Sequence, residues 1–289
     1  MNHLPDQFQV QLAQPDQFLN PYRWVNDEEQ NFCPVIHARF MLDGRPIDAY
    51  AKLMDLHLPA GQIDCLNEIS GWLIAKACGL PVANRAFIAS ILASDLPPHA
   101  AISQRISQPD QALYFFCTEQ ITVAQARGII PNEALVEEQA RWEHCHATIA
   151  LDEWLANPDR HLFNLIRKAK DQFALIDHGQ LLRRSDTGPW WHKDELPQLV
   201  NMMLSNCLHR HTIHVRNVTA PEAISEAYSR CVDDAAAQAR SLGRVLHEIS
   251  FWCGAIAPGQ SAAWLHFLVN RVQNARTLLS ARFRVLNLA

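Results

Sequence analysis

The hydrophobic pattern of this chain changes near residue 120. Before that point, short apolar runs at residues 35–42 and 47–54 flank the turn Asp43-Gly44, which predicts a β-hairpin. A stretch with apolar residues at helical spacing follows at residues 64–80, where Gly79 supplies a stop. Two further apolar runs, at residues 86–89 and 113–117, predict two more strands. The first 120 residues are therefore expected to form a small sheet that carries one helix.

After residue 122 the pattern becomes mainly helical. Residues 133–155 predict one long helix, which Pro158 would end. Short apolar runs at 162–166 and 173–176 around a polar turn predict a second hairpin, and helices are expected from residue 195 onward, including 220–241 and 262–279. The pattern predicts an α+β protein with a β-rich N-terminal part, 1–120, and a larger, mainly helical C-terminal part, 121–289.

Composition narrows the possible partners. Of the 289 residues, 48% are hydrophobic and 19% are charged, as in an ordinary globular protein, and the formal net charge is -5. This charge excludes a global positive field, so we expect no direct nucleic-acid partner and no anionic membrane partner. The eight cysteines form no C-x-x-C pair, the first residues lack the basic and apolar blocks of a signal peptide, and no apolar run approaches the length needed to span a membrane. We therefore expect a cytoplasmic protein with reduced thiols.

Three polar residues carry the most informative pattern. Asp159 and Asn164 lie five positions apart in the run Asn157-Pro158-Asp159-Arg160-His161-Leu162-Phe163-Asn164, and Asp177 ends the next predicted strand, before His178-Gly179. Phosphoryl transfer needs a carboxylate that orients the attacking hydroxyl, and oxygen ligands for the magnesium ions on the phosphates. Protein kinases present an Asp, an Asn and an Asp-x-Gly in this order. The pattern indicates an ATP-dependent phosphotransferase.

These two segments resemble the HipA-like kinases, a bacterial family within the wider set of protein-kinase-like and lipid-kinase-like folds. Upstream, Lys52 at the end of a predicted strand and Glu68 inside the next predicted helix are similar to the family's phosphate-binding lysine and its helix glutamate. The matches extend discontinuously over roughly residues 35–180. The resemblance implies a bilobal protein-kinase-like fold with an N-terminal ATP-binding lobe, 1–120, and a helical catalytic lobe, 121–289.

The resemblance also implies a role for each residue, with ATP and Mg²⁺ as cofactors. Asp159 would be the catalytic residue that orients the acceptor hydroxyl, and Asn164 and Asp177 would hold magnesium. Lys52 would contact the α- or β-phosphate while Glu68 holds it. Adenine would meet the backbone of the segment that contains Glu119 and Ile121.

By the same resemblance, the acceptor would be a serine or threonine hydroxyl of a protein. A small-molecule or lipid kinase is an alternative, because the wider fold set includes such enzymes. Some HipA relatives act as toxins with a small DNA-binding partner and others do not, so the resemblance leaves an antitoxin-like protein partner open. Residues 26–34, which occupy the place of the phosphate-covering loop, contain no glycine and three acidic residues. That departure favours a third alternative, a pseudokinase that acts as a nucleotide-binding interaction module.

Overall fold

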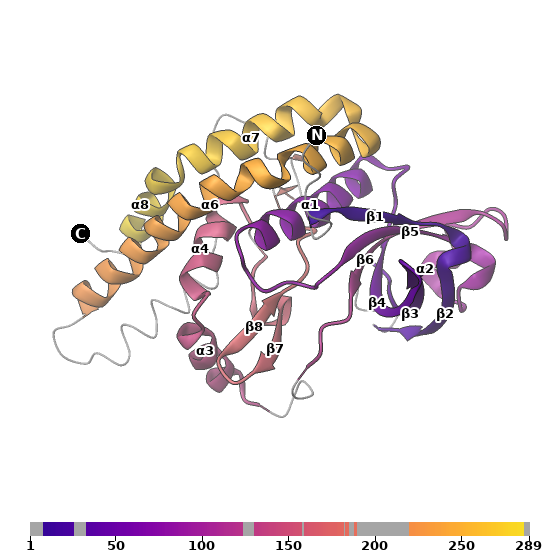
Figure 1. Cartoon of the computed structure of the whole chain (residues 1–289), viewed down its shortest axis with the longest axis horizontal. Helices are drawn as coiled ribbons and strands as arrows, with labels where there is room; N and C mark the ends of the chain where they lie inside the picture. The colour runs from indigo at the N-terminus through magenta and orange to yellow at the C-terminus, as the bar shows by residue number, and fades with distance from the viewer. Residues whose placement is uncertain are drawn as a thin grey trace.

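A computed structural model describes residues 8–25, 33–123, 130–157, 159–181, 183–184, 188–189 and 220–285. The protein is α+β: a mixed six-stranded sheet forms one end, and long C-terminal helices run beside it (Figure 1). Along the sheet the order is β1-β5-β6-β4-β3-β2. β1 pairs parallel with β5 and all other neighbours pair antiparallel. The strands are β1 Val10–Ala13, β2 Phe18–Trp24, β3 Val35–Leu42, β4 Arg45–Met54, β5 Ala86–Leu92 and β6 Ala112–Glu119.

The predicted first hairpin is confirmed as β3 and β4. Its turn consists of Asp43 and Gly44, with φ angles of 51° and 71°, and Leu42 pairs with Arg45. Two consecutive residues with positive φ define the turn type whose twist matches that of the flanking strands. The turn thus fixes the register that places Lys52 near the far end of β4, opposite Phe116 of β6.

Helix α1, Pro59–Ala77, packs between the sheet and the C-terminal helices. It begins five residues before the predicted start, because Pro59 suits the first turn of a helix, where its missing N–H group is no loss. It ends as predicted at Gly79, whose φ is 75°, and the N–H of Leu80 donates to the carbonyl of Ala75 over 3.0 Å. Most side chains from Cys65 onward in this helix are buried.

The single helix predicted over residues 133–155 is wrong. The structure has two helices there, α3 Asn132–Arg141 and α4 Cys145–Trp154. Trp142 leaves the helix with extended backbone (ψ 128°), and its buried ring packs edge-on against Phe173. The burial of this indole outweighs the helical propensity of its neighbours.

The second predicted hairpin is present, but its first strand starts later than expected. Residues Leu162–Asn164 form a 3-10 turn, and the strands are β7 Leu165–Ala169 and β8 Gln172–Leu175. Asp171, with a φ of 55°, forms the hairpin turn. Because the strand begins only at Leu165, Asn164 lies at the end of a loop rather than inside the sheet.

In the C-terminal residues that the structure describes, the helices are α6 Ala220–Ile256, α7 Ser261–Gln273 and α8 Ala275–Val285. The helix predicted over 220–241 continues to residue 256, and the one predicted over 262–279 is divided between α7 and α8. The helices predicted between residues 195 and 219 lie outside the described residues. Shorter elements within the described ranges are α2 Ala100–Ser103, the pair β9 Arg183–Arg184 and β10 Gly188–Pro189, and 3-10 turns at Pro15–Gln17, Ala93–Asp95 and Pro258–Gln260.

Two apolar clusters lie on opposite faces of the sheet. The first contains only residues between Ala13 and Cys117, and Ile102 of α2 belongs to it. The second joins the other face of the sheet to α1, α4, α6, α7 and the β7–β8 hairpin. This second core therefore crosses the expected boundary at residue 120. None of the helices in the described ranges is long and apolar enough to cross a membrane.

Candidate functional site

Lys52, Glu68 and Asp177 meet in one ionic cluster, although they come from three different elements. The ammonium Nζ of Lys52 lies 2.7 Å from Glu68 Oε1 and 2.7 Å from Asp177 Oδ1. Glu68 is almost fully buried on α1, whereas 40% of the Asp177 side chain is exposed. The cluster therefore has one deeply buried acid and one acid that faces solvent.

The pKa values of Lys52 and Asp177 depend on the charges of their neighbours in this cluster. Burial by itself would lower the pKa of Lys52, but the carboxylates of Glu68 and Asp177 raise it well above its ordinary value. Burial opposes the ionisation of Asp177 as well, and the nearby Lys52 ammonium nevertheless lowers the pKa of Asp177 to about 2. Lys52 and Asp177 are thus both charged at neutral pH.

Backbone geometry keeps the cluster in place. Asp177 has a φ of 56°, a conformation that directs the chain sharply away from β8. The next residue but one is Gly179, where a Cβ atom would lie 2.9 Å from Lys52 Nζ and 3.1 Å from Glu68 Oε1. Asn67, the neighbour of Glu68, donates from Nδ2 to the carbonyl of Gly179 over 2.7 Å. Glycine at 179 therefore allows the chain to approach the ion pair closely.

Asp159 and Asn164 lie at the two ends of one short loop and contact each other directly. Asn164 Nδ2 donates to the Asp159 carbonyl over 2.7 Å and to Asp159 Oδ2 over 3.1 Å. The backbone N–H of Asp159 donates to Asn157 Oδ1 over 3.0 Å. Because the amide nitrogen of Asn164 is bound to Asp159, its oxygen is the end left for other ligands.

The loop is joined to the segment that carries Asp177. The N–H of Ile176 donates to the Asn164 carbonyl over 3.2 Å. Ile176 is the residue before Asp177, so this hydrogen bond ties the segment of Asp177 to Asn164. His161, which lies in the same loop, places Nε2 3.7 Å from Asp159 Oδ1, too far for a hydrogen bond. Hydrogen bonds thus connect Asn164 both to Asp159 and to Ile176, the residue before Asp177.

Arg160 is the centre of a buried polar network that supports this loop. Its fully buried guanidinium contacts both carboxylate oxygens of Asp152, at 3.3 and 3.2 Å, and donates to the carbonyls of Asn164 and Ile176, at 3.1 and 2.9 Å. Asn157 donates from Nδ2 to Asp152 Oδ1 over 2.8 Å. Sequence patterns did not single out Arg160 or Asp152, and the only sequence signal for Arg160 is its position beside Asp159.

The start of the loop is anchored by the end of α4. Ala156 has a φ of 51°, and the N–H of Asn157 donates to the carbonyl of Asp152 over 2.8 Å, which is the hydrogen bond of a Schellman motif. The buried Arg271 of α7 donates to the Trp154 carbonyl over 2.8 Å. A cation at the carboxyl end of a helix interacts favourably with the helix dipole, so α7 stabilises the end of α4 from which the loop departs.

Glu119 and Ile121 lie at the end of β6 and just after it. Glu119 pairs with Ala49, three residues along β4 from Lys52, which corresponds to roughly 10 Å along the strand. The N–H of Glu119 already donates to the carbonyl of Arg85 over 3.0 Å. The segment expected to contact adenine therefore lies near Lys52 along the sheet. The backbone N–H of Glu119 is already bonded to Arg85 and is not a free donor for a ligand.

The donor groups of Asp177 and Asn164 fit magnesium. An ionised carboxylate and an amide oxygen are the hard ligands this ion takes, and proteins usually hold it with one or two carboxylates while substrate phosphates and waters fill the remaining positions. Among the described residues, no group of three or more His, Cys, Asp or Glu side chains is placed to hold a metal. If a magnesium ion bound here, Asp177 and Asn164 would supply one carboxylate and one amide oxygen, and phosphates and waters would fill its remaining positions.

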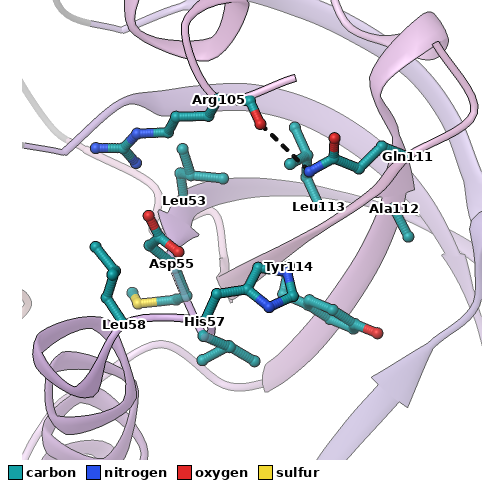
Figure 2. A pocket seen from close by; sticks show the side chains of 11 residues that line it. Leu53, Asp55, His57, Leu58, Arg105, Gln111, Ala112, Leu113 and Tyr114 are labelled. Carbon is teal, nitrogen blue, oxygen red and sulfur yellow. Dashed lines mark hydrogen bonds between the residues drawn. The ribbon is translucent and has the colours of Figure 1, made fainter. Parts of the chain in front are cut away.

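A separate surface hollow lies beyond the end of β4. It measures about 240 Å³ and lies between the β4–α1 connection and the first residues of β6 (Figure 2). Leu53, Asp55, His57, Arg105 and Tyr114 are among its lining residues. The candidate site residues do not line this hollow: Lys52, Glu68, Asp159, Asn164 and Asp177. Most of the glycine-free segment, residues 26–32, lies outside the described residues.

No protein-family model matches this chain, and no curated protein matches it significantly.

Proposed function

We propose that this protein is an ATP- and Mg²⁺-dependent phosphotransferase of HipA-like type. The observation that carries the proposal is the position of Lys52, which contacts Glu68 and Asp177 at once. In protein kinases, a strand lysine paired with a helix glutamate, together with a metal-binding aspartate, must be in place for phosphoryl transfer. Here these three groups come from β4, from α1 and from the residue after Ile176.

In the proposed reaction each residue has a distinct task. Lys52 offers its ammonium to a phosphate oxygen, and the buried Glu68 keeps that ammonium in position. Asn164 and Asp177 would hold the magnesium ion, whose chemical contribution is to neutralise charge on the transferred group. Asp159 accepts a hydrogen bond from the acceptor hydroxyl and orients it towards the γ-phosphate.

The proposed fold is bilobal and kinase-like. The six-stranded sheet with α1 would form the ATP-binding lobe, and α3, α4, the β7–β8 hairpin and the C-terminal helices would form the catalytic lobe. This assignment rests on the placement of Lys52 and Glu68 in the first group of elements, and of Asp159, Asn164 and Asp177 in the second. Adenine would lie against the segment from Glu119 to Ile121.

For the acceptor we propose a serine or threonine hydroxyl of a protein. The side chain of Asp159 is 40% exposed, and Phe163, in the same loop, is 57% exposed. An exposed carboxylate and an exposed aromatic ring in one loop leave room for a macromolecular acceptor. A small-molecule or lipid kinase differs only in the acceptor, and parallel incubations with protein and lipid extracts separate these possibilities.

The test measures phosphoryl transfer from labelled ATP in the presence of Mg²⁺. We expect the wild-type protein to label itself or a lysate protein, and Asp159→Asn to lower the rate by about 10²-fold or more, because a positioned acid–base group contributes this much. Asp177→Asn should remove Mg²⁺-dependent ATP binding as well. Asp110→Asn, an exposed aspartate in the loop before β6, is the matched control and should leave both quantities unchanged.

A nucleotide-binding module without turnover is the second candidate, favoured by the acidic, glycine-free composition of residues 26–34. Wild-type protein that binds Mg²⁺ and ATP through Lys52 and Asp177, but transfers no phosphoryl group to any fraction, would establish this alternative. Failure to bind ATP at all would refute both candidates.

A further inference from the structure

His178 lies between α1 and the loop that carries Asp159. Its backbone N–H donates to Glu68 Oε2 over 2.8 Å. Its side chain lies against Gly71, one helical turn after Glu68, where an added Cβ atom would be 2.4 Å from His178 Cβ and 2.5 Å from Cγ. Only glycine at position 71 leaves space for the imidazole. The ring is therefore seated on the face of α1 that also presents Glu68.

The imidazole also contacts Arg160. The ring is almost fully buried, and its Nδ1 lies 3.3 Å from Arg160 Nη2. A guanidinium only donates, so Nδ1 accepts this hydrogen bond and the ring proton of the neutral imidazole is on Nε2. Arg160 in turn donates to the carbonyls of Asn164 and Ile176. A continuous series of contacts leads from Gly71 through His178 and Arg160 to the backbone of the loop.

Packing alone does not explain an imidazole at this position. Nε2 of His178 is buried and has no hydrogen-bond partner among the described residues. A buried polar group without a partner lowers stability, and an apolar side chain of similar size would avoid that loss. An apolar side chain would not, however, provide an acceptor for Arg160 Nη2.

We propose that His178 is a positioning residue that couples the placement of α1 to that of the Asp159–Asn164 loop. Nδ1 of His178 accepts a hydrogen bond that orients the Arg160 guanidinium. Arg160 in turn orients the carbonyls of Asn164 and Ile176, to which it donates. The catalytic consequence, a constant relation between the Lys52–Glu68 pair and Asp159, rests on the phosphotransferase function proposed above. The mechanical coupling does not depend on that function.

The first test compares two substitutions of similar size, His178→Asn and His178→Leu. The Oδ1 atom of asparagine occupies the same distance along the side chain as Nδ1 of histidine, so it preserves the acceptor that leucine lacks. In the nucleotide-free protein, we expect amide hydrogen exchange at Asn164 and Ile176 to be about tenfold faster or more in His178→Leu. Exchange in His178→Asn should stay within about twofold of the wild type.

Steady-state kinetics provide the second measurement. His178→Leu should lower kcat by about tenfold or more and leave the Kd for Mg²⁺-ATP within about twofold, whereas His178→Asn should restore kcat. A wild type that transfers no phosphoryl group, combined with the expected exchange pattern, would refute the phosphotransferase and leave the coupling intact. Equal exchange rates for the leucine and asparagine variants would overturn the coupling, whatever the activity.

Gly71→Ala provides an independent test from the helix side. Alanine in a helix interior normally stabilises a helix relative to glycine. At Gly243 of α6, an added Cβ would meet nothing within 4 Å, so Gly243→Ala is the matched control and should be neutral or stabilising. Gly71→Ala should instead displace the His178 ring and accelerate exchange at Asn164 and Ile176, as His178→Leu does. Unchanged exchange at these two amides in Gly71→Ala would contradict the coupling, even if His178→Leu proved too unstable to purify.

Discussion

The buried pair of Arg160 and Asp152 offers a sharp test of what supports the candidate site. Both side chains have no exposed area, and among the described residues the side chains that bind the Asp152 carboxylate are those of Arg160 and Asn157. Burial raises the pKa of Asp152, while the attraction of Arg160 opposes that rise. Arg160→Met therefore leaves a carboxylate in the interior with only the Asn157 amide as a partner.

Removing one member of a buried ion pair costs about 3–5 kcal/mol, because the remaining charge is not compensated. The free energy of unfolding of a folded domain is only about 5–15 kcal/mol, so the loss is a large share of the total. We expect Arg160→Met to lower the free energy of unfolding by about 3–5 kcal/mol. Adding Asp152→Asn to this variant should recover about 1–3 kcal/mol, since it removes the stranded charge.

The assay is urea unfolding at neutral pH, followed by tryptophan fluorescence and by far-UV circular dichroism. Coincident transitions would justify a two-state free energy. Arg141→Met is the control, because Arg141 pairs with Asp171 at the surface, where both side chains are about one-third exposed, and such a pair contributes about 1 kcal/mol or less. An Arg160→Met variant that loses no more stability than Arg141→Met, or a double variant less stable than Arg160→Met, would refute the reasoning.

Two further predictions concern the ionic cluster itself. Gly179→Ala places a Cβ atom 2.9 Å from Lys52 Nζ and should weaken Mg²⁺-ATP binding by about tenfold in calorimetry, whereas Gly254→Ala, whose Cβ would meet nothing within 4 Å, should not. The pKa of Asp177, about 2, lies below the ordinary value of 3.8, so its ion pair with Lys52 stabilises the protein above about pH 4 and is lost as the pH falls towards 2. NMR titration should show the pKa of Asp177 rising above 3.8 in Lys52→Met, because burial then acts without the ammonium, and a value that stayed near 2 would contradict this account.

The elements that the sequence predicts well are those with strong local signals. The Asp43-Gly44 turn and the stop at Gly79 both need backbone with positive φ, and the sequence places suitable residues at both positions. The break at Trp142 has no such local signal, because it depends on burial against Phe173 some thirty residues later. Sequence patterns indicated neither β1 nor β2, although β1 pairs with β5 and Val10 donates to Glu248 of α6.

In the candidate site, too, local sequence signals were predictive and long-range packing was not. The sequence predicts that Lys52, Glu68 and Asp177 belong to one site, and in the structure Lys52 contacts both Glu68 and Asp177. The roles of Gly71 and Arg160 are not visible in the sequence. A helix-interior glycine costs stability relative to alanine in any sequence, and its benefit appears only when the His178 ring is placed beside it.

The geometry of Lys52 also bears on how a nucleotide would enter the proposed site. An ammonium group has three N–H donors, and two of them are directed to Glu68 and Asp177. No third hydrogen bond of Lys52 is seen among the described residues, so in the proposed site the third donor would reach a phosphate oxygen without loss of either carboxylate. Asp177, with 40% of its side chain exposed, has a second carboxylate oxygen to offer a cation while Oδ1 keeps its contact with Lys52. In the proposed site, the nucleotide-free cluster would therefore receive a metal-bound triphosphate by adding contacts, and the buried Glu68 would not need to move.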